Sequence, residues 1–253
     1  MCANEPSIGW LAADWPLPPG VQAGTTTRHG GVSHTPFDTL NLATHVGDDP
    51  AAVTQNRQRL RAALKLPAEP RWLDQVHGTL VAEDAPAPGE CPVADAAYTN
   101  QPGEVLAVLT ADCLPVVFAR TDGQEIAVAH AGWRGLAAGV LESTLARFSA
   151  PPGAIQVWLG PAIGARAFEV GDEVRTAFLA VDADSTDAFE PTGTPGKWWA
   201  DLFWLARRRL ARAGISAIFG GGLCTASLRE QFYSYRGSGG RCGRMATLVW
   251  RSR

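Results

Sequence analysis

The feature that most constrains the fold is a series of short apolar runs separated by segments rich in Gly, Pro and polar residues. The runs cover residues 105–109, 116–119, 125–129, 154–159, 215–219 and 246–250. A further strand is expected within residues 20–31, where the chain runs into a Gly-Gly turn. Runs of this length bounded by turn residues are typical of buried strands. Since tight loops join some of them and helical segments join others, the pattern predicts a mixed α/β architecture.

Three segments have helical periodicity. The first covers about residues 50–66, with Asp49 as its N-cap and Pro50 in its first turn. The others cover residues 136–148 and 199–210, and Gly214 is expected to end the last. Residues 183–197 are polar with Gly and Pro, which predicts a surface loop.

The first helix has an interrupted apolar stripe. Val53, Leu60 and Leu64 line it, but Asn56 and Arg57 occupy positions that should complete it. A buried arginine is costly unless it meets an anion. Two interpretations of Arg57 therefore stay open: a structural ion pair with an internal carboxylate, or a contact with the substrate.

Composition excludes several classes of protein. The chain has 253 residues with 46% hydrophobic content, and no internal boundary is visible, so residues 1–253 are expected to form one domain. A net charge of -3 disfavours nucleic acid as a partner. No stretch approaches the roughly 18 apolar residues of a membrane span, and the first residues do not form a secretory signal. Five scattered cysteines fit a reducing compartment. The sequence predicts a cytoplasmic protein without membrane partners.

Chemistry tends to lie where apolar strands end in loops that carry His, Cys and Asp. Three such places are QVHG at His77, TADCLP at Cys113 and VAHAGWRG at His130. Two His and one Cys form a ligand set that zinc accepts, with a fourth position left for water or substrate. Spacing alone leaves an alternative open, in which Cys113 is a buried structural thiol and His130 a hydrogen-bonded imidazole. The other histidines, at positions 29, 34 and 45, are expected to lie in loops or in the core.

These motifs resemble those of the multicopper polyphenol oxidoreductase (laccase-domain) family, whose members have also been described as purine nucleoside phosphorylases and as a peptidoglycan editing factor. The resemblance covers nearly the whole chain. It rests on TTRHGGVSHTPFDTLNL at 26–42, HVGDDPAAVTQNR at 45–57, DQVHG at 74–78, ADAAYT at 94–99, LTADCLPVVF at 109–118, HAGWRG at 130–135, LGPAIG at 159–164, CTAS at 224–227 and FYSYRGSGGRCGR at 232–244.

The resemblance implies a four-layer α/β/β/α sandwich with mixed sheets, similar to the catalytic domain of cytotoxic necrotising factors. It also implies a metal held by His77, Cys113 and His130. The laccase name fits this sequence poorly, because laccases need several coppers with HxH pairs, and this chain has no HxH pair. We therefore expect zinc, although copper also tolerates this ligand set.

The activity that the resemblance implies is phosphorolysis of adenosine, inosine and methylthioadenosine, with deamination of adenosine alongside. Cys113 and His130 are then catalytic as well as metal ligands, and Asp112 or Asp95 would orient or deprotonate a water. Cys113 has a rival role as a thiolate nucleophile paired with His130. Zinc ligation is preferred over that role.

Phosphorolysis also needs cations that hold phosphate. Five arginines lie in the motifs: Arg134 is assigned to catalysis, and Arg28, Arg57, Arg236 and Arg244 to substrate binding. At least two of the five are expected only to tie loop carbonyls together. Three aromatic residues are candidates for stacking on a purine, with core packing as the alternative: Phe37, Trp133 and Phe232.

Other functions stay open at this stage. One is hydrolysis of a wrongly incorporated amino acid from a UDP-muramoyl precursor, with UDP-muramoyl-serine as substrate. Others are laccase-like oxidation of polyphenols and a non-catalytic metal-binding role with a closed fourth position. The partners expected are small molecules, and a monomer is preferred. One departure from many relatives is Phe168, where a tyrosine is common; Cys242 is expected to be an inert thiol.

Overall fold

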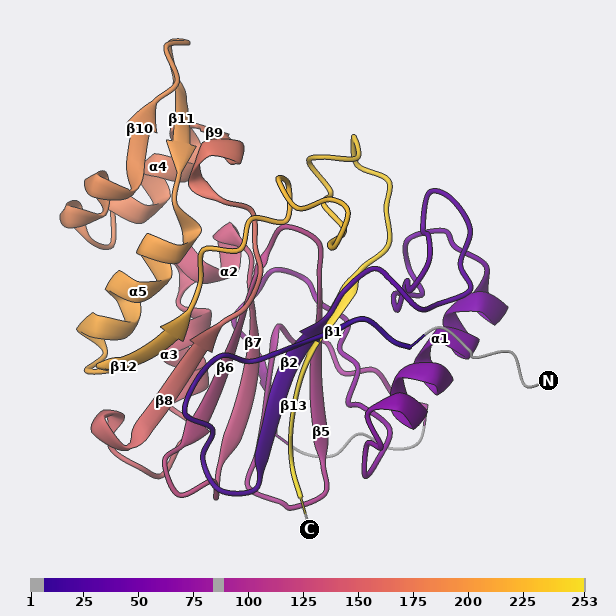
Figure 1. Cartoon of the computed structure of the whole chain (residues 1–253). Coiled ribbons are helices and arrows are strands. Elements are labelled where there is room, and N and C mark those ends of the chain that lie inside the picture. The colour runs from indigo at the N-terminus through magenta and orange to yellow at the C-terminus, as the bar shows by residue number, and fades with distance from the viewer. Residues whose placement is uncertain (1–6, 84–88, 253) are drawn as a thin grey trace.

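The structure is a computed structural model that describes residues 7–83 and 89–252, and its centre is two β-sheets packed face to face (Figure 1). The first sheet has four strands in the order β1-β2-β13-β5, and all of its neighbours are antiparallel. Its strands are β1 (Trp10–Ala12), β2 (Val21–Thr26), β13 (Met245–Arg251) and β5 (Val105–Thr110). The two ends of the described chain therefore pair within one sheet.

The second sheet has six strands in the order β12-β8-β6-β7-β4-β3. They are β12 (Ala217–Gly220), β8 (Ile155–Leu159), β6 (Leu114–Arg120), β7 (Ile126–Ala131), β4 (Ala96–Thr99) and β3 (Val81–Ala82). The central pairs are antiparallel, whereas the two edge strands β12 and β3 pair parallel to their neighbours. The sheet is therefore mixed, as the irregular order of loops and helices predicted.

A third, smaller sheet has the order β10-β11-β9. It consists of β10 (Phe189–Pro191), β11 (Lys197–Ala200) and β9 (Glu169–Gly171). This sheet and α4 (Asp172–Leu179) form the upper left part of Figure 1.

Helices cover the outer face of each main sheet, which gives the four layers. α1 (Pro50–Ala63) packs through Leu60 on the face of the first sheet that carries Leu248 and Trp250. On the other side, α2 (Trp133–Ala138), α3 (Val140–Leu145) and α5 (Leu202–Arg212) pack on the second sheet. The predicted α/β/β/α order is confirmed. None of the helices in the described chain is long and apolar enough to cross a membrane.

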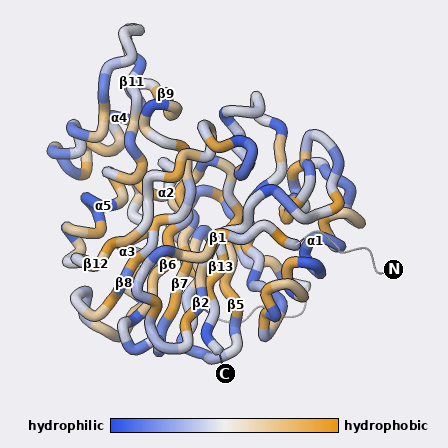
Figure 2. Tube along the Cα trace, viewed as in Figure 1, coloured by the Kyte–Doolittle hydropathy of each residue, from blue (hydrophilic) through white to orange (hydrophobic). Residues whose placement is uncertain are grey.

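The two sheets bury both faces of their strands, which explains why the apolar runs are continuous. In β6, Val116 and Phe118 face the helices, whereas Val117 and Ala119 face the first sheet. Successive side chains of a strand point to opposite faces, so a strand buried on both sides needs apolar residues at every position. Figure 2 shows these hydrophobic stretches along the strands of both sheets.

α1 begins as the sequence predicted, and its interrupted stripe has a structural reason. The Asp49 carboxylate accepts from the Ala51 N–H, and Pro50 occupies the first turn. Asn56 is fully buried, and hydrogen bonds satisfy its side-chain amide there. Its Oδ1 accepts from the Val32 N–H, and its Nδ2 donates to the carbonyl of Asn41. The ion-pair interpretation of Arg57 is wrong within the described residues. Its guanidinium lies 4.0 Å from the centre of the Trp72 ring, and its Nε donates to the Leu42 carbonyl.

Four sequence expectations need correction. The helix expected over residues 136–148 is two helices, because Gly139 between them has φ 103°, which a helix excludes. β7 continues through His130 rather than ending before it. Trp199 lies in β11, so the last helix begins at Leu202 with Asp201 as its N-cap. Residues 183–197 are not one loop: they form a 3₁₀-helix (Ala183–Ala188), β10 and the start of β11.

Two further 3₁₀-helices, Pro152–Ala154 and Ala165–Ala167, flank β8 and the loop that follows it. Cys2 lies outside the described residues. The other four cysteines are free thiols: Cys91, Cys113, Cys224 and Cys242.

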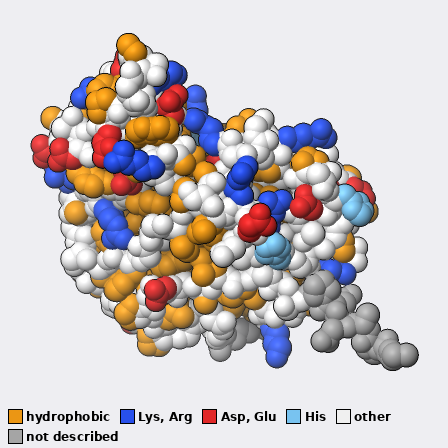
Figure 3. Space-filling view, turned by 45° about the horizontal axis from the view of Figure 1, so that its top comes forward, with side chains coloured by type: hydrophobic (Ala, Val, Ile, Leu, Met, Phe, Trp, Pro, Cys, Tyr) orange, Lys and Arg blue, Asp and Glu red, His pale blue; other side chains and the backbone are white. Residues whose placement is uncertain are grey.

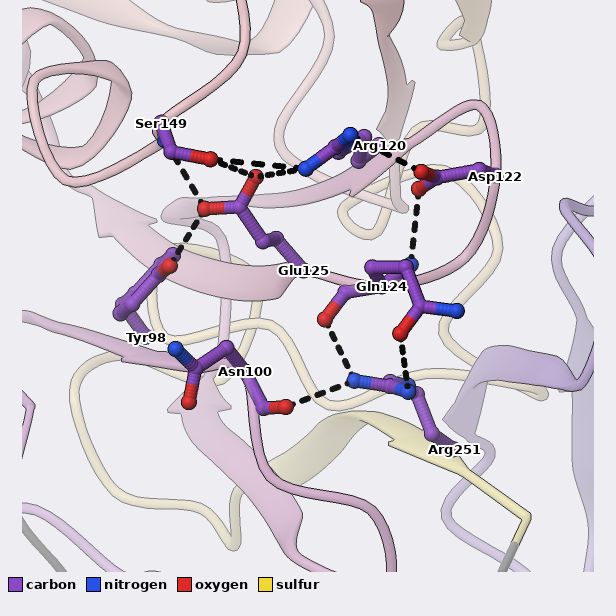
Figure 4. A network of polar contacts seen from close by, with 8 residues as sticks. All are labelled: Tyr98, Asn100, Arg120, Asp122, Gln124, Glu125, Ser149 and Arg251. Atoms are coloured by element: carbon purple, nitrogen blue, oxygen red, sulfur yellow. Dashed lines mark hydrogen bonds and ion pairs between the residues drawn. The ribbon is translucent and has the colours of Figure 1, made fainter.

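A buried carboxylate fixes the end of β7 that lies away from His130 (Figure 4). Glu125 precedes β7 and accepts hydrogen bonds from the Tyr98 hydroxyl at 2.6 Å, the Ser149 N–H at 2.8 Å and Arg120 Nη1 at 3.2 Å. Burial alone would raise the pKa of Glu125, but these donors outweigh it and hold the pKa below its usual value. The ionised carboxylate therefore stabilises the fold.

We expect Glu125→Gln to lower the free energy of unfolding by about 2–3 kcal/mol at pH 7, because an amide cannot accept from all of these donors. Since the folded-state pKa is depressed, the contribution of Glu125 is present above the unfolded-state pKa of roughly 4.3 and is lost as pH falls below it. The free energy of unfolding, measured by urea titration, should therefore fall less between pH 7 and pH 3 in the variant than in the wild type. The exposed Glu190, paired with Arg166, is the control, and Glu190→Gln should change stability by less than about 1 kcal/mol. Equal pH dependence of Glu125→Gln and wild type would contradict this prediction.

Candidate metal centre

Strand pairing brings two of the three predicted metal ligands together. β6 and β7 are antiparallel, and Pro115 is the partner of His130. Cys113 directly precedes β6, so its thiol lies beside the end of β7 that carries His130. His77 approaches on the loop before β3, and its ring centre lies 4.7 Å from that of His130. The sheet thus joins residues that are far apart in the sequence.

The three side chains have the geometry of a metal site. One ligand atom from each of His77, Cys113 and His130 lies within 4.8 Å of the other two. Cys113 Sγ is 3.8 Å from His77 Nε2, whereas ligands of a tetrahedral zinc with ordinary bond lengths are separated by about 3.5 Å. The donor set fits the metal that the resemblance implies. Within the described chain this is the one such group of three or more His, Cys, Asp or Glu side chains.

Asp95 holds both histidines of the site. Its carboxylate, which is fully buried, accepts from His130 Nδ1 at 2.8 Å and from the backbone N–H of His77 at 2.9 Å. It also accepts from the N–H of Gly78 at 2.6 Å. The bond to Nδ1 fixes the tautomer of His130 and leaves Nε2 for the metal. Asp95 therefore orients one ligand through its ring and the other through its backbone.

His77 adopts a backbone conformation that side chains rarely take. Its φ is 60°, in the left-handed region. This conformation costs about 1 kcal/mol for a residue with a Cβ. The hydrogen bonds from the N–H groups of His77 and Gly78 to Asp95 offset this cost, so the loop presents the His77 ring to Cys113.

Gly132 allows the ligands to approach. A Cβ at this position would lie 2.8 Å from His77 Cδ2 and 3.1 Å from Cys113 Sγ. Any larger residue would displace at least one ligand. The requirement for glycine in the HAGWRG motif is thus steric, since the backbone passes directly behind the centre.

The electrostatics of the centre favour the thiolate form of Cys113. Burial alone would raise the pKa of this thiol, but His130 and His77 outweigh burial and lower the pKa to about 6. Burial alone would lower the pKa of His130, but Cys113 and Asp95 raise it to about 9. Thiolates are the form that binds metals. A metal held by His77, Cys113 and His130 would displace the proton of His130, so its affinity would depend on pH.

The centre opens into a cavity of about 460 Å³. Three of the five predicted arginines line it: Arg134, Arg236 and Arg244. Arg134 lies in the first turn of α2, and its guanidinium carbon lies 4.4 Å from the centre of the Trp133 ring. In the view of Figure 3, which turns the top of Figure 1 forward, basic, acidic and histidine side chains lie close together near the middle of the face.

Asp112 also lines the cavity, but its carboxylate is engaged with the protein. Oδ1 accepts from the Thr225 hydroxyl at 2.6 Å, and Oδ2 accepts from the Arg236 N–H at 2.7 Å. The two aspartates that the sequence suggested therefore have different contacts. Asp95 accepts hydrogen bonds from His130 and His77, whereas Asp112 accepts hydrogen bonds from the loops around the cavity.

The other two arginines do not line this cavity. Arg28 pairs with Asp38 at 3.2 Å and donates to the Arg229 carbonyl. Arg57 lines a neighbouring cavity of about 680 Å³. Arg28, Arg57 and Arg244 each donate to a loop carbonyl. That at least two of the five arginines serve only this purpose stays a prediction.

Of the three aromatic candidates, only Trp133 lines the cavity, and Phe37 and Phe232 are buried in the core. Cys242 is buried in the core with Phe232. Phe168 lines the cavity and supports the guanidinium of Arg236, whose carbon lies 5.3 Å from the ring centre.

His45 and Tyr235 are among the cavity-lining residues that sequence reasoning missed. Both lie in quoted motifs, at the start of HVGDDP and within FYSYRGSGG, so motif membership was the available signal. His45 lines both cavities, as does Leu109. Burial lowers the pKa of His45, and Arg244 acts in the same direction.

Comparison with known proteins gives a consistent result. The family model described as "Multi-copper polyphenol oxidoreductase laccase" matches residues 22–252. A purine nucleoside phosphorylase from Pseudomonas aeruginosa is 53% identical over 241 residues, which cover 95% of this chain and 98% of that protein. The purine nucleoside phosphorylase YfiH from Escherichia coli is 53% identical over 240 residues, with the same coverage of both chains.

Solved structures agree. A Neisseria meningitidis protein superposes with a TM-score of 0.93 at 46% identity, and the match covers 97% of this chain and 100% of that one. YlmD from Geobacillus stearothermophilus superposes with a TM-score of 0.89 at 33% identity, covering 97% of each chain. The architecture described above is therefore that of these proteins.

We expect Asp95→Asn to weaken zinc binding by about 10- to 100-fold. The Nδ2 group of asparagine is a donor and cannot accept from His130 Nδ1 or from the N–H groups of His77 and Gly78. Competition with a chromophoric chelator measures this affinity. Asp187, exposed and distant in sequence from the ligands, is the control, and Asp187→Asn should bind zinc like the wild type. Unchanged zinc affinity in Asp95→Asn would show that Asp95 does not hold the centre.

Proposed function

The chain belongs to the multi-copper polyphenol oxidoreductase laccase family, and within this enzyme family we propose that it acts as a zinc-dependent purine nucleoside phosphorylase. One observation carries the proposal: a three-ligand metal site opens into a cavity that three arginines line. The names of relatives at 53% identity point to the same activity. Its substrates would be a purine nucleoside, such as adenosine, inosine or methylthioadenosine, and inorganic phosphate.

Zinc is the metal that we propose for the site. Two imidazoles and a thiolate suit zinc, and copper tolerates the same set. Among the described residues there is one cluster of possible ligands, which argues against the several coppers of a laccase. A bound zinc with an open fourth position supplies Lewis-acid chemistry, which polarises an oxygen of water or substrate.

The arginines would bind the phosphate. Arg134 lies over Trp133 and, within the described chain, donates no hydrogen bond to the protein, so its donors are available to an anion. Arg244 donates from Nη1 to the carbonyls of Cys242 and Gly243, which fixes its position. Guanidinium groups bind phosphate oxygens through paired N–H donors. Among the described residues that line the cavity, three arginines outnumber one carboxylate, Asp112, so the cavity favours an anion.

Phosphorolysis breaks the bond between C1′ of ribose and N9 of the purine, and it forms a bond between C1′ and a phosphate oxygen. The electron pair of the broken bond stays with the purine, which takes up a proton. The products are free base and ribose 1-phosphate. The chain would contribute by holding phosphate against C1′ and by packing the base against the aromatic lining of Trp133, Phe168 and Tyr235.

Deamination of adenosine is a second reaction that we propose for the same centre. It needs a water activated by the metal, whereas phosphorolysis needs the arginines. Cys113 and His130 would act in it as metal ligands, with Asp95 orienting His130. The two reactions should therefore depend equally on the ligands but differently on Arg134.

One observation favours a larger substrate as a second candidate. The neighbouring cavity of about 680 Å³ shares His45 and Leu109 with the cavity of the metal site. Together they offer more space than a nucleoside needs. A UDP-muramoyl precursor, with its serine removed by hydrolysis at the metal, would use both.

We also propose a cytoplasmic monomer that forms one domain over residues 1–253. The four described cysteines are free thiols, which is the usual state in reducing compartments. The net charge of -3 gives no attraction for nucleic acid or anionic lipid.

Zinc-loaded protein should convert adenosine to adenine and ribose 1-phosphate when phosphate is present, with inosine as the product of the parallel deamination. Chromatography of the products measures both reactions. His77→Ala and Cys113→Ala should reduce both rates by at least about 100-fold, because they dismantle the centre.

His34→Ala is the matched control, because His34 is exposed and does not line the cavity, and it should retain full activity. Untouched adenosine with wild-type protein would overturn the nucleoside proposal. In that case release of serine from UDP-muramoyl-serine, lost in Cys113→Ala, would support the second candidate.

A further inference from the structure

Asp112 occupies an unusual place in the turn between β5 and β6. Its φ is 85°, in the left-handed region, and only 6% of its surface is exposed. Aspartate and asparagine tolerate this conformation better than most residues. A buried carboxylate must be fully hydrogen-bonded to be stable, and both oxygens of Asp112 are.

The two donors come from different loops. Thr225 lies in the CTAS segment and donates its hydroxyl at 2.6 Å, and Arg236 lies in the Gly-rich segment before β13 and donates its backbone N–H at 2.7 Å. The carbonyl of Asp112 accepts from Ile163 N–H, in the GPAIG loop, at 2.9 Å. One residue therefore joins three loops around the cavity, and the next residue along the chain is the metal ligand Cys113.

Arg236 depends on this attachment. The residue is exposed and is followed by the sequence Gly237-Ser238-Gly239-Gly240, which gives its backbone little stiffness. Its side chain lies over Phe168, and its Nη1 donates to the Glu169 carbonyl at 2.9 Å. The bond from its N–H to a buried carboxylate is charge-assisted and short, and it attaches the start of this loop to the β5–β6 turn.

From this arrangement we infer that Asp112 is a positioning residue: its carboxylate holds the Arg236 loop against the β5–β6 turn and so places the Arg236 guanidinium at the metal cavity to bind the phosphate substrate. This inference rests on the proposed function for the identity of the anion. It assigns Asp112 a role different from proton transfer.

The geometry disfavours Asp112 as a general base. Its Oδ1 accepts from the Thr225 hydroxyl at 2.6 Å, and its Oδ2 accepts from the Arg236 N–H at 2.7 Å. A base needs an oxygen directed at the substrate proton. Both oxygens of Asp112 are directed at the loops instead.

Two substitutions separate the roles. Asp112→Asn keeps the shape and the tolerance of positive φ: its oxygen can accept from Arg236 N–H, and its amide can donate to the Thr225 hydroxyl, which rotates to accept. Asp112→Gly keeps the backbone conformation but removes both attachments. Arg236→Ala removes the anchored guanidinium, and Arg241→Ala, in the same segment but outside the cavity lining, is its matched control.

Calorimetric titration of each zinc-loaded protein with inorganic phosphate gives a readout that does not need turnover. We expect Asp112→Asn and Arg241→Ala to bind phosphate within about threefold of wild type, and Asp112→Gly and Arg236→Ala about tenfold more weakly. The double variant Asp112→Gly/Arg236→Ala should also be about tenfold weaker, not about 100-fold, because both changes remove one interaction. Zinc affinity should stay within about threefold of wild type in all variants.

Kinetics with adenosine add a second readout. The positioning role predicts a raised KM for phosphate in Asp112→Gly and a nearly unchanged kcat in Asp112→Asn. A base would instead lose about 100-fold or more in kcat in Asp112→Asn, with phosphate affinity unchanged. That result would overturn the inference, as would multiplicative effects in the double variant or a loss of zinc from Asp112→Gly.

The phosphate titrations still test the positioning role of Asp112 if adenosine is not the substrate. Wild-type protein that binds phosphate through Arg236 and Asp112 but leaves adenosine intact would refute the proposed function and support the positioning role. If Asp112→Gly does not fold, the kcat of Asp112→Asn decides between the two roles, since both roles leave its phosphate affinity unchanged.

Discussion

The centre depends on one buried carboxylate, that of Asp95, and its contacts with the two histidine ligands. It bonds the ring of His130, which β7 supplies, and the backbone of His77, whose loop has a left-handed turn. Without an acceptor at this point, the loop has no compensation for its conformation and the His130 ring has no fixed tautomer. Cys113 then completes a ligand set that neither loop nor strand forms alone.

The two-sheet core makes this arrangement rigid. The antiparallel pairing of β6 and β7 fixes Cys113 beside His130, and apolar side chains bury both faces of the sheet behind them. At the other end of β7, Glu125 secures the strand with its own set of donors. Of the three clustered side chains, β7 therefore carries His130, whereas Cys113 directly precedes β6 and His77 lies on the loop before β3.

Sequence reasoning predicted the layers and named three side chains that cluster in the structure, but it did not predict the hydrogen bonds that hold them. The apolar runs predicted the strands because both faces are buried, and the motifs named His77, Cys113 and His130. The break at Gly139 was missed because the apolar period continues across it. The separate tasks of Asp95 and Asp112 could not be predicted, because they depend on which donors the fold brings to each carboxylate. The likeness to cytotoxic necrotising factors and the single domain stay predictions.

X-ray absorption at the zinc edge of the loaded wild-type protein tests the central claim most directly, because it reports the ligands without assuming a reaction. A centre formed by His77, Cys113 and His130 predicts one sulfur at about 2.3 Å and nitrogen or oxygen neighbours at about 2.0–2.1 Å, with histidine scattering from two rings. Cys113→Ala should lose the sulfur signal. A spectrum without sulfur, or one that Cys113→Ala leaves unchanged, would contradict the account.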